Sequence, residues 1–373
     1  MHIERRGLPL LAVLLVLGAA LAALAACAQE RGPDAGWDDS SSAVILLYHH
    51  VSDDTPRSTS VSPQRFREHL AHLEENAFNV WPLPRLLDAL AGAEPIPPRT
   101  LAITFDDAYA SVYDTAWPLL RARGWPFTVF VSTQYIDDRL ASYMSWDQLR
   151  EIEADGATLA NHSRSHPSMA HPRPDESRRE WLARIRAEIV DAQARLDAET
   201  RAPARLFAWP YGEYSPPVQA LLEELGFIGL AQRSGAVGPA SDFTALPRFP
   251  MAFGFDDLEQ FALKVRTRPL PVLAVEPASG VLAADQSDAE IRFTLDEQAA
   301  IRIDAINCFS RGRPIDIERV GDSPPRFRVS NVQPIGVGRT TFNCTAPASD
   351  ANVWYWASFL WMRPRPDGSW YEG

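Results

Sequence analysis

The sequence predicts an α/β protein: a closed or nearly closed (β/α) barrel followed by a small all-β domain. Between residues 43 and 266, short apolar runs alternate with segments of helical periodicity, and such strand–helix repeats form a parallel sheet covered by helices. About 220 residues with six or more of these units suit a barrel. From residue 276 to 373 the pattern changes to short β runs without helical signals, which indicates a sandwich-like domain. The proline-rich residues 267–275 are expected to be the linker.

The expected elements of the barrel follow one another along the chain. Residues 44–48 (VILLY) form a continuous apolar run, typical of a strand buried on both faces. Ser62 followed by Pro63 is an N-cap with proline at the first helical position, so a helix should begin there. Residues 101–105 predict the next strand. Further strands are expected at 127–131, 157–161, 206–209 and 227–230, and helices are expected to end near Gly124, Gly156, Glu199 and Gly226.

The first 26 residues have the pattern of an export signal. Arg5 and Arg6 precede an apolar run over residues 8–26, as in secretory signal peptides. Residues 24–27 (LAAC) resemble a bacterial lipobox, which predicts cleavage and lipidation at Cys27. A plain signal peptide or an uncleaved anchor are the alternatives. Residues 27–42 then form a polar tether, and we expect a protein held only by its N-terminal lipid at the bacterial cell envelope, on the periplasmic side of a membrane.

Amino-acid composition and net charge limit the kinds of molecule that this protein can bind. A hydrophobic content of 46% and a charged content of 23% are ordinary for a folded protein. The net charge of −12 argues against a nucleic-acid partner and favours a neutral or cationic substrate. With Cys27 lipidated, Cys308 and Cys344 remain as an even pair in an oxidising compartment, which predicts a disulfide. Two separate buried thiols are the alternative.

Polar residues gather where the expected strands end. In (β/α) barrels the working residues lie at the carboxyl ends of the strands, so these clusters should meet at one rim. The clusters are His49-His50, Asp106-Asp107, Asn161-His162 and Trp209-Pro210-Tyr211.

Four of these residues have the spacing of a metal site with an adjacent base. His162 and His166 are four residues apart, so on one helical turn they would face the same way. With one carboxylate they could hold a dication, and the second carboxylate could then act as a general base toward water. The plainer interpretations are a helix N-cap for Asp106-Asp107 and a surface coincidence for the histidines.

These motifs resemble those of a known family. Residues 104–107 (TFDD) and 162–166 (HSRSH) resemble the first two motifs of the polysaccharide deacetylases, the fourth carbohydrate esterase family, also called the NodB homology domain. Residues 207–212 (FAWPYG) resemble the third. Residues 48–51 (YHHV) and 246–248 (LPR) are closer to the branch that acts on poly-β-1,6-N-acetylglucosamine. The similarity covers about residues 43–265.

The resemblance implies a distorted (β/α) barrel and metal-dependent removal of acetyl groups from N-acetylglucosamine units of a polysaccharide. Carried over motif by motif, Asp106 is the base, and a divalent metal, usually zinc, is held by Asp107, His162 and His166. The third motif implies a substrate-binding group in which Tyr211 donates its backbone N–H to the oxyanion hole. The members of this group are Trp209, Pro210 and Tyr211.

Two departures from the family pattern leave roles to fill. Ala208 stands where the family usually has an arginine that orients the base, and Arg248 is the candidate replacement. No histidine follows His171, so the family's late general acid is missing. His49 is the candidate acid because it directly follows a strand and can point into the barrel mouth, whereas His50 would point the other way. The alternative for His49 is a structural ring bonded to backbone.

Three other functions remain open. A deacetylase of peptidoglycan or chitin-like oligomers would use the same catalytic residues. Two histidines and one carboxylate also serve non-haem iron oxygenases, although there the order is usually His-x-Asp and then His. A lipid-anchored glycan-binding protein with weak or no activity would fit the two departures.

The β domain has no predicted role, but its aromatic residues allow a statement about its core. Residues 353–362 (VWYWASFLWM) lack polar interruption, as buried strands do. We therefore expect Trp354, Trp356 and Trp361 in the core, and only Trp370 and Tyr371 as exposed candidates for sugar contacts.

Overall fold

The computed structural model describes residues 41–373 except residues 202, 298–299, 332, 350–352 and 372–373. These residues belong to one compact unit. The expected signal peptide, Cys27 and nearly all of the expected tether lie outside the described residues. Among the helices of the described part, none has both the length and the apolar character that crossing a bilayer requires.

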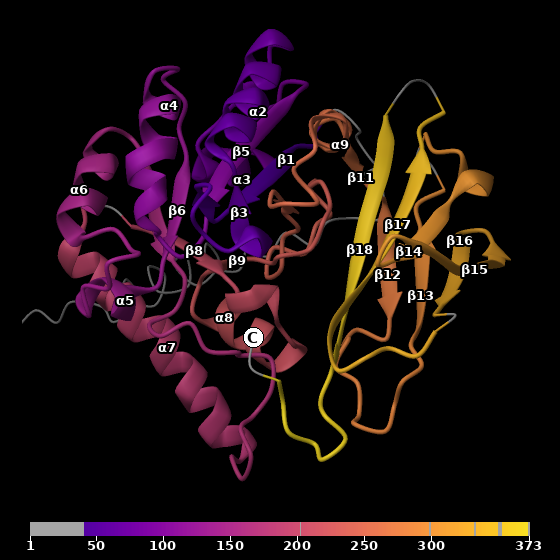
Figure 1. Cartoon of the computed structure of the whole chain (residues 1–373). Helices are drawn as coiled ribbons and strands as arrows, with labels where there is room; N and C mark the ends of the chain where they lie inside the picture. The colour runs from indigo at the N-terminus through magenta and orange to yellow at the C-terminus, as the bar shows by residue number, and fades with distance from the viewer. Residues whose placement is uncertain (1–40, 202, 298–299, 332, 350–352, 372–373) are drawn as a thin grey trace, which may run out of the picture. The chain divides into compact units, whose positions relative to one another are not determined.

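The first sheet is parallel and forms the centre of the barrel (Figure 1). Its strand order is β10-β1-β5-β6-β7-β8-β9, and β4 pairs with the start of β5. Every residue of β1 and β5 is buried, as expected for strands that helices cover on one face and a core fills on the other. The bounds are β1 (Val44–Tyr48), β4 (Asn79–Val80), β5 (Thr100–Phe105), β6 (Thr128–Val131), β7 (Thr158–Asn161), β8 (Ala204–Ala208), β9 (Ile228–Leu230) and β10 (Phe249–Pro250).

The segment of residues 246–251, which contains the edge strand β10, connects β9 to β1. At one end the backbone N–H of Leu246 donates to Gly229 of β9, and at the other the N–H of Met251 donates to Leu47 of β1, both at 2.8 Å. The expected distorted barrel is therefore confirmed, closed by the short strand β10 on the β1 side and by an isolated bridge between Leu246 and Leu230 on the β9 side.

Helices surround this sheet (Figure 1) and begin where local chemistry predicts. Ser62 Oγ accepts the N–H of Arg65, with Pro63 at the first helical position, which confirms that start. Ser145 and Ser177 each open a helix with a capping box. The bounds are α2 (Pro63–Glu75), α3 (Leu83–Leu90), α4 (Trp117–Arg121), α5 (Thr133–Asp137), α6 (Trp146–Ala154), α7 (Arg178–Glu199), α8 (Pro216–Glu224) and α9 (Leu258–Lys264). Shorter elements are β2 (His50–Val51), β3 (Ser60–Val61), a 3₁₀ turn at Arg57–Thr59, a π turn at Val112–Ala116, and 3₁₀ turns at Pro210–Gly212 and Ile303–Ala305.

The C-terminal domain is one sheet folded over itself. The long strand β15 pairs with β14 through its first residues and with β16 through the rest, so the sheet turns over at this strand. The ring of Phe293 stacks on that of Phe359 from the opposite layer, at 5.5 Å between centroids. The expected sandwich-like domain is therefore present. The strand order is β11-β18-β17-β14-β15-β16-β13-β12. The bounds are β11 (Arg268–Pro269), β12 (Val272–Glu276), β13 (Glu290–Leu295), β14 (Asn307–Ser310), β15 (Arg313–Asp322), β16 (Pro325–Ser330), β17 (Gly338–Pro347) and β18 (Trp354–Arg363).

Residues 267–275 are not the linker that their prolines suggested. They supply β11, which pairs with β18, and most of β12, which pairs with β13. These two strands are the opposite edges of the sheet. An edge strand tolerates proline because a missing N–H breaks no ladder bond there, so the prolines mark edge strands.

β18 separates the two sides of the β domain by residue parity. Tyr355, Phe359 and Trp361 belong to the core of the domain. Trp356 turns instead toward the barrel and packs edge-on against Phe249 of β10, at 5.4 Å between ring centroids. Trp354, on that same side at the strand's start, is 37% exposed, so its expected place in the core is wrong. The error has a simple cause: both faces of β18 are apolar because one contacts a second domain.

Candidate metal and catalytic site

Asp106 and Asp107 follow β5 directly, where the backbone leaves the sheet. Asp107 and Ala108 have positive φ (71° and 61°), so the chain turns sharply there. Both carboxylates are buried, at 2% and 7% exposure. Two buried like charges in sequence are costly unless each has partners, and the structure gives each a different set.

The partner of Asp106 is Arg248. The two form a bidentate ion pair, with Nη1–Oδ1 at 2.7 Å and Nη2–Oδ2 at 2.8 Å. Arg248 is fully buried and also donates through Nε to the carbonyl of Ala231. Burial would raise the pKa of Asp106, but the Arg248 guanidinium outweighs it and lowers that pKa below its ordinary value. Asp106 is therefore an ionised carboxylate held in one orientation, and the residue chosen from sequence to replace the missing arginine contacts it.

Asp107 instead faces His162 and His166. Its Oδ1 lies 3.4 Å from the Nε2 atom of each histidine, and the three possible ligand atoms lie within 4.8 Å of one another. His162 Nδ1 lies 2.8 Å from the carbonyl oxygen of Ala208 and donates to it, so Nε2 is the ring nitrogen that faces Asp107 and that a metal would bind. Two imidazoles and a carboxylate, one ring oriented by a backbone carbonyl, fit a divalent metal such as zinc.

Burial would lower the pKa of His162, but Asp106 and Asp107 outweigh it and raise that pKa, so a metal binding there would displace a proton. The other two groups already have the protonation states that metal binding needs. Burial lowers the pKa of His166 to about 4, aided by the neighbouring His162, so its ring is neutral near pH 7. Burial opposes a charge on Asp107 as well, yet His162 and other nearby imidazoles hold the pKa of Asp107 below its ordinary value. The site thus offers an ionised carboxylate and a neutral imidazole, the forms in which these groups bind metals.

The two histidines do not lie on a helical turn, as their spacing had suggested. Ser163 and His166 have positive φ (68° and 55°), and residues 162–166 form a loop. The loop's N–H groups at 164 and 165 donate to the carboxylate of Glu188 on α7 instead of to helical carbonyls. The rings still converge, because an acceptor 24 and 23 residues away in sequence from these two N–H groups shapes the loop.

The third motif is a tight turn, and only part of it reaches the site. Trp209 is fully buried and its indole N–H donates to the carbonyl of Thr244, so the expected substrate contact is wrong for Trp209. Pro210 is buried too and shapes the turn. Tyr211 is half-buried, has a φ of 59°, and sets its ring edge-on to His166 at 4.5 Å. Gly212 is required, since a Cβ there would lie 2.4 Å from Gln232.

His49 and His50 leave β1 in different directions. His49 lines a cavity of about 510 Å³ together with Tyr211. Burial lowers the pKa of His49, against the opposing charges of Asp107 and Asp106, so its ring is neutral near pH 7. His50 stacks on Tyr109 with 3.6 Å between ring centroids. His49 as the acid remains a prediction, and the structure places only His49 at this cavity.

Sequence reasoning missed three tyrosines beside the site. Tyr109 and Tyr135 both pack against Tyr143, at 4.9 and 4.8 Å between ring centroids. Burial, and then the charge of Asp107, raises the pKa of Tyr109 and of Tyr135. Tyr109 follows the Asp106-Asp107 motif closely enough to have been suspected. Tyr135 lies on α5 and Tyr143 in the loop after it, neither in a motif, and only the fold brings them together.

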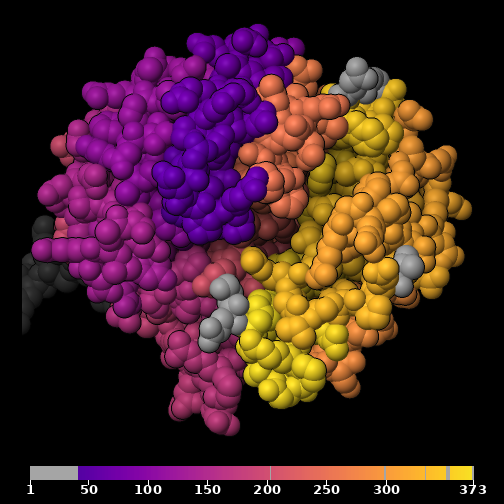
Figure 2. Space-filling model, in the orientation of Figure 1, coloured from indigo at the N-terminus to yellow at the C-terminus, as the bar shows by residue number. Residues whose placement is uncertain are grey.

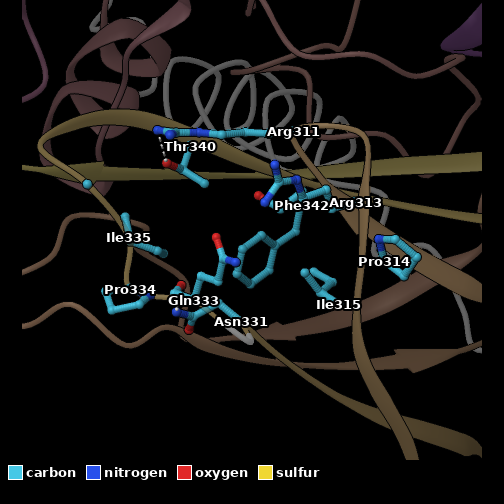
Figure 3. A pocket seen from close by; sticks show the side chains of 12 residues that line it. Arg311, Arg313, Pro314, Ile315, Asn331, Gln333, Pro334, Ile335, Thr340 and Phe342 are labelled. Carbon is cyan, nitrogen blue, oxygen red and sulfur yellow. Dashed lines mark hydrogen bonds between the residues drawn. The ribbon is translucent and has the colours of Figure 1, made fainter.

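A second cavity of about 400 Å³ lies within the β domain (Figure 3). Its described lining includes Arg311, Arg313 and Phe342 but no carboxylate or imidazole, so it carries none of the chemistry described above. Cys308 and Cys344, expected to pair, are joined by a disulfide across β14 and β17.

Comparison with known proteins assigns the barrel to a family. Residues 93–229 match the family model of the Polysaccharide deacetylase domain, and this segment includes Asp106, Asp107 and both histidines. The chain contains a polysaccharide deacetylase domain. Over 255 residues it is 26% identical to the poly-β-1,6-N-acetyl-D-glucosamine N-deacetylase of Escherichia coli K12, with 59% of this chain covered. The match spans 38% of that relative's length.

Solved structures of deacetylases share the fold of the barrel. The deacetylase PplD of Streptococcus pyogenes superposes with a TM-score of 0.54 at 20% identity, covering 60% of this chain and 98% of that one. The BpsB deacetylase domain of Bordetella bronchiseptica superposes with a TM-score of 0.50 at 26% identity, covering 58% of this chain and 98% of that one. Each match covers nearly all of the solved chain but only about three-fifths of this one.

The metal ligands can be tested by metal content. His162→Ala and His166→Ala should each abolish metal retention after dialysis, because two protein ligands rarely hold zinc. His72→Ala serves as a control, since His72 packs against Phe78 and Phe261 and has no part in the site. Metal bound at full strength by the double variant would contradict the assignment.

The Asp106–Arg248 pair predicts a pH-dependent stability. Arg248→Met should lower the free energy of unfolding at pH 7 by about 3–5 kcal/mol, because it leaves a buried charge unpaired. The paired Asp106, with its lowered pKa, contributes stability above the ordinary carboxyl pKa and loses it as pH falls.

In Arg248→Met, burial of Asp106 is opposed only by the nearby His162 and His49, so the pKa of Asp106 rises and its protonation becomes more favourable. The stability difference from wild type should therefore shrink between pH 7 and pH 4 in denaturant unfolding. Arg248→Lys keeps the charge and should lose less. A difference that stays constant with pH would show that Asp106 does not carry the effect.

Proposed function

We propose that this protein hydrolyses the acetamide groups of N-acetylglucosamine units in a polysaccharide, with a divalent metal, zinc by expectation, at Asp107, His162 and His166. One observation carries the proposal: beside the possible metal site lies Asp106, ionised and fixed by Arg248. That arrangement keeps a base from becoming a ligand, which a hydrolase needs and a simple metal-binding protein does not.

The residues divide the reaction among them. A metal at this site would supply Lewis-acid polarisation of water and of the acetamide oxygen. Asp106 takes a proton from the attacking water while Arg248 keeps its carboxylate oriented. The backbone N–H of Tyr211 donates to the tetrahedral oxyanion, and burial of the site strengthens that hydrogen bond.

The leaving nitrogen must then receive a proton. His49 is neutral in the resting site, so it cannot bring a proton of its own near pH 7. It can instead carry the proton that Asp106 has accepted, and both aspartates lie close enough to influence its pKa. One proton leaves the water and one reaches the amine, so the residues of the site neither gain nor lose a proton in these steps.

The polymer is proposed from similarity. The relative in Escherichia coli is named for poly-β-1,6-N-acetyl-D-glucosamine, and we propose the same linkage here. A peptidoglycan or chitin-oligomer deacetylase would share every catalytic residue, so substrate assays must decide between them. The oxygenase alternative does not fit a polysaccharide deacetylase domain.

A glycan-binding role without catalysis is the non-enzymatic alternative. The buried Asp106–Arg248 pair argues against it, because two buried charges cost stability and a binding protein would have no use for an ionised carboxylate there. We also propose, from the sequence alone, that lipidation at Cys27 holds the protein at the cell envelope.

Asp106→Asn tests the base. We expect it to keep its metal and to lose turnover by about 10²- to 10⁴-fold, the usual size of a general-base contribution. The assay is release of acetate from defined β-1,6 and β-1,4 N-acetylglucosamine oligomers, with metal content measured in parallel. Loss of metal together with activity would make Asp106 a ligand, and unchanged turnover would refute the mechanism.

His49→Ala tests the proton carrier, with His50→Ala as its matched control. The first variant should lower kcat by about 10²-fold at unchanged metal content, since the amine leaves poorly without a proton. The second should do much less, because His50 stacks on Tyr109 and does not line the cavity. Wild-type rates in both would assign proton delivery to solvent.

A further inference from the structure

The cavity that contains His49 has walls from two domains. The barrel contributes His49 and Tyr211, together with Met251 and Phe255. Strands β17 and β18 and the C-terminal segment contribute the opposite wall: Gly338, Arg339, Thr341, Leu360 and Tyr371. Its volume of about 510 Å³ falls within the range of about 300–1,000 Å³ typical of small-molecule sites. Figure 2 shows the surface hollowed between the barrel and the yellow strands.

Arg339 of the β domain contacts the turn that carries Tyr211. Its Nη1 donates to the carbonyl of Tyr211, and its Nε lies 3.6 Å from the carboxylate of Glu213. Tyr211 is a non-glycine residue with positive φ, a conformation that persists only where outside contacts support it. Arg339 therefore holds, from the other domain, the peptide beside the metal ligands.

Glu213 connects three parts of the site. It is fully buried and accepts hydrogen bonds from Ser168, just beyond the histidine loop, and from the hydroxyl of Tyr371, both at 2.7 Å. Trp370 next to it stacks on His171 at 3.8 Å between ring centroids. The C-terminal residues expected to be exposed thus pack against the barrel beside the third motif.

The second wall is fixed in place by polar contacts. Arg233 of the barrel donates to the carbonyl of Ser358, and Ser358 Oγ donates to the carbonyl of Ser234. Ser358 is buried, so these bonds form away from water. Together with the packing of Trp356 on Phe249, they hold β18 against the barrel.

The lining suits a sugar chain. Leu360, Met251 and Phe255 present apolar surface, and Phe255 is 60% exposed. Arg339 and Tyr371 add polar groups at the same cavity, and Gln232 lies with them. A pyranose ring has an apolar face and a hydroxylated edge, so it matches a lining that is apolar in part and polar in part.

We propose that the β domain completes the substrate site: it forms one wall of a subsite for the pyranose units next to the reacting one, and Arg339, through the carbonyl of Tyr211, is a positioning residue for the turn that carries the Tyr211 N–H. The inference rests on the proposed deacetylation, whose polymer substrate must extend beyond one unit. It gives a role to a domain that lies outside the matched family segment.

Three variants test the wall. Thr341→Trp fills the cavity from β17, and Val320→Trp places the same side chain at an exposed position of β15 as a control. Arg339→Ala removes the contact to Tyr211, with Arg339→Lys as the conservative partner and Arg313→Ala as the control arginine at the second cavity. Circular dichroism and metal content verify folding and the metal site.

The readouts separate binding from chemistry. Binding of N-acetylglucosamine oligomers of one to six units is measured by calorimetry in the Asp106→Asn background, and turnover is measured with the same oligomers and with 4-nitrophenyl acetate. The affinity for the oligomers is expected to rise with chain length, and Thr341→Trp should reduce that rise at least tenfold. Val320→Trp should change neither oligomer binding nor ester hydrolysis by more than twofold. Arg339→Ala should lower kcat about 10- to 100-fold on both substrates with a smaller change in KM, and Arg339→Lys should recover part of it.

The outcomes distinguish the two proposals. Oligomers that bind in a wall-dependent manner without being hydrolysed would refute the deacetylation and support the subsite. Oligomers that are deacetylated equally by wild type, Thr341→Trp and Arg339→Ala would overturn the subsite and leave the deacetylation standing. Oligomers that are neither bound nor hydrolysed would refute both.

Discussion

The buried ion pair between Asp106 and Arg248 is the constraint on which the site depends. Neither group can remain charged away from water without the other, so their positions are fixed together. Arg248 lies in residues 246–251, the segment that joins β9 to β1, and it also bonds Ala231 at the end of β9. The ionised state of Asp106 therefore depends on closure of the barrel, because the closing segment supplies Arg248. Without that segment, Asp106 would be protonated or exposed.

This pair also determines how the neighbouring residues divide their work. Arg248 engages both oxygens of Asp106, which leaves Asp107 alone to face the imidazoles of His162 and His166. The guanidinium of Arg248 neutralises only one of the two carboxylates, and it pairs with both oxygens of Asp106. A dication would therefore bind Asp107, whose negative charge has no arginine partner among the described residues. Two adjacent residues of the same type acquire different roles because their partners differ.

The sequence predicted local features well and long-range ones poorly. The buried strands, the Ser62 cap and the members of the possible metal site follow from periodicity and from motifs. The loop shape of residues 162–166 did not, since the acceptor that bends it, Glu188, lies on a distant helix. Trp209 and Trp354 were misjudged because an aromatic residue at a strand end can face a core, a cavity or solvent, and only tertiary packing decides. Arg248 is separated from Asp106 by 142 residues. It was suggested only because Ala208 stands where the family usually has an arginine.

As Arg248 orients the base, a second arginine, Arg339 of the β domain, contacts the turn that carries the proposed oxyanion donor. Tyr211 adopts a backbone conformation that needs support, and it contacts His166 on one side and Arg339 on the other. Arg339 lies on β17, the strand that the disulfide through Cys344 joins to β14. In the proposed mechanism, the disulfide thus stabilises the strand from which Arg339 positions the turn of Tyr211. Because disulfides form in exported proteins, this links the expected export of the protein to the geometry of its site.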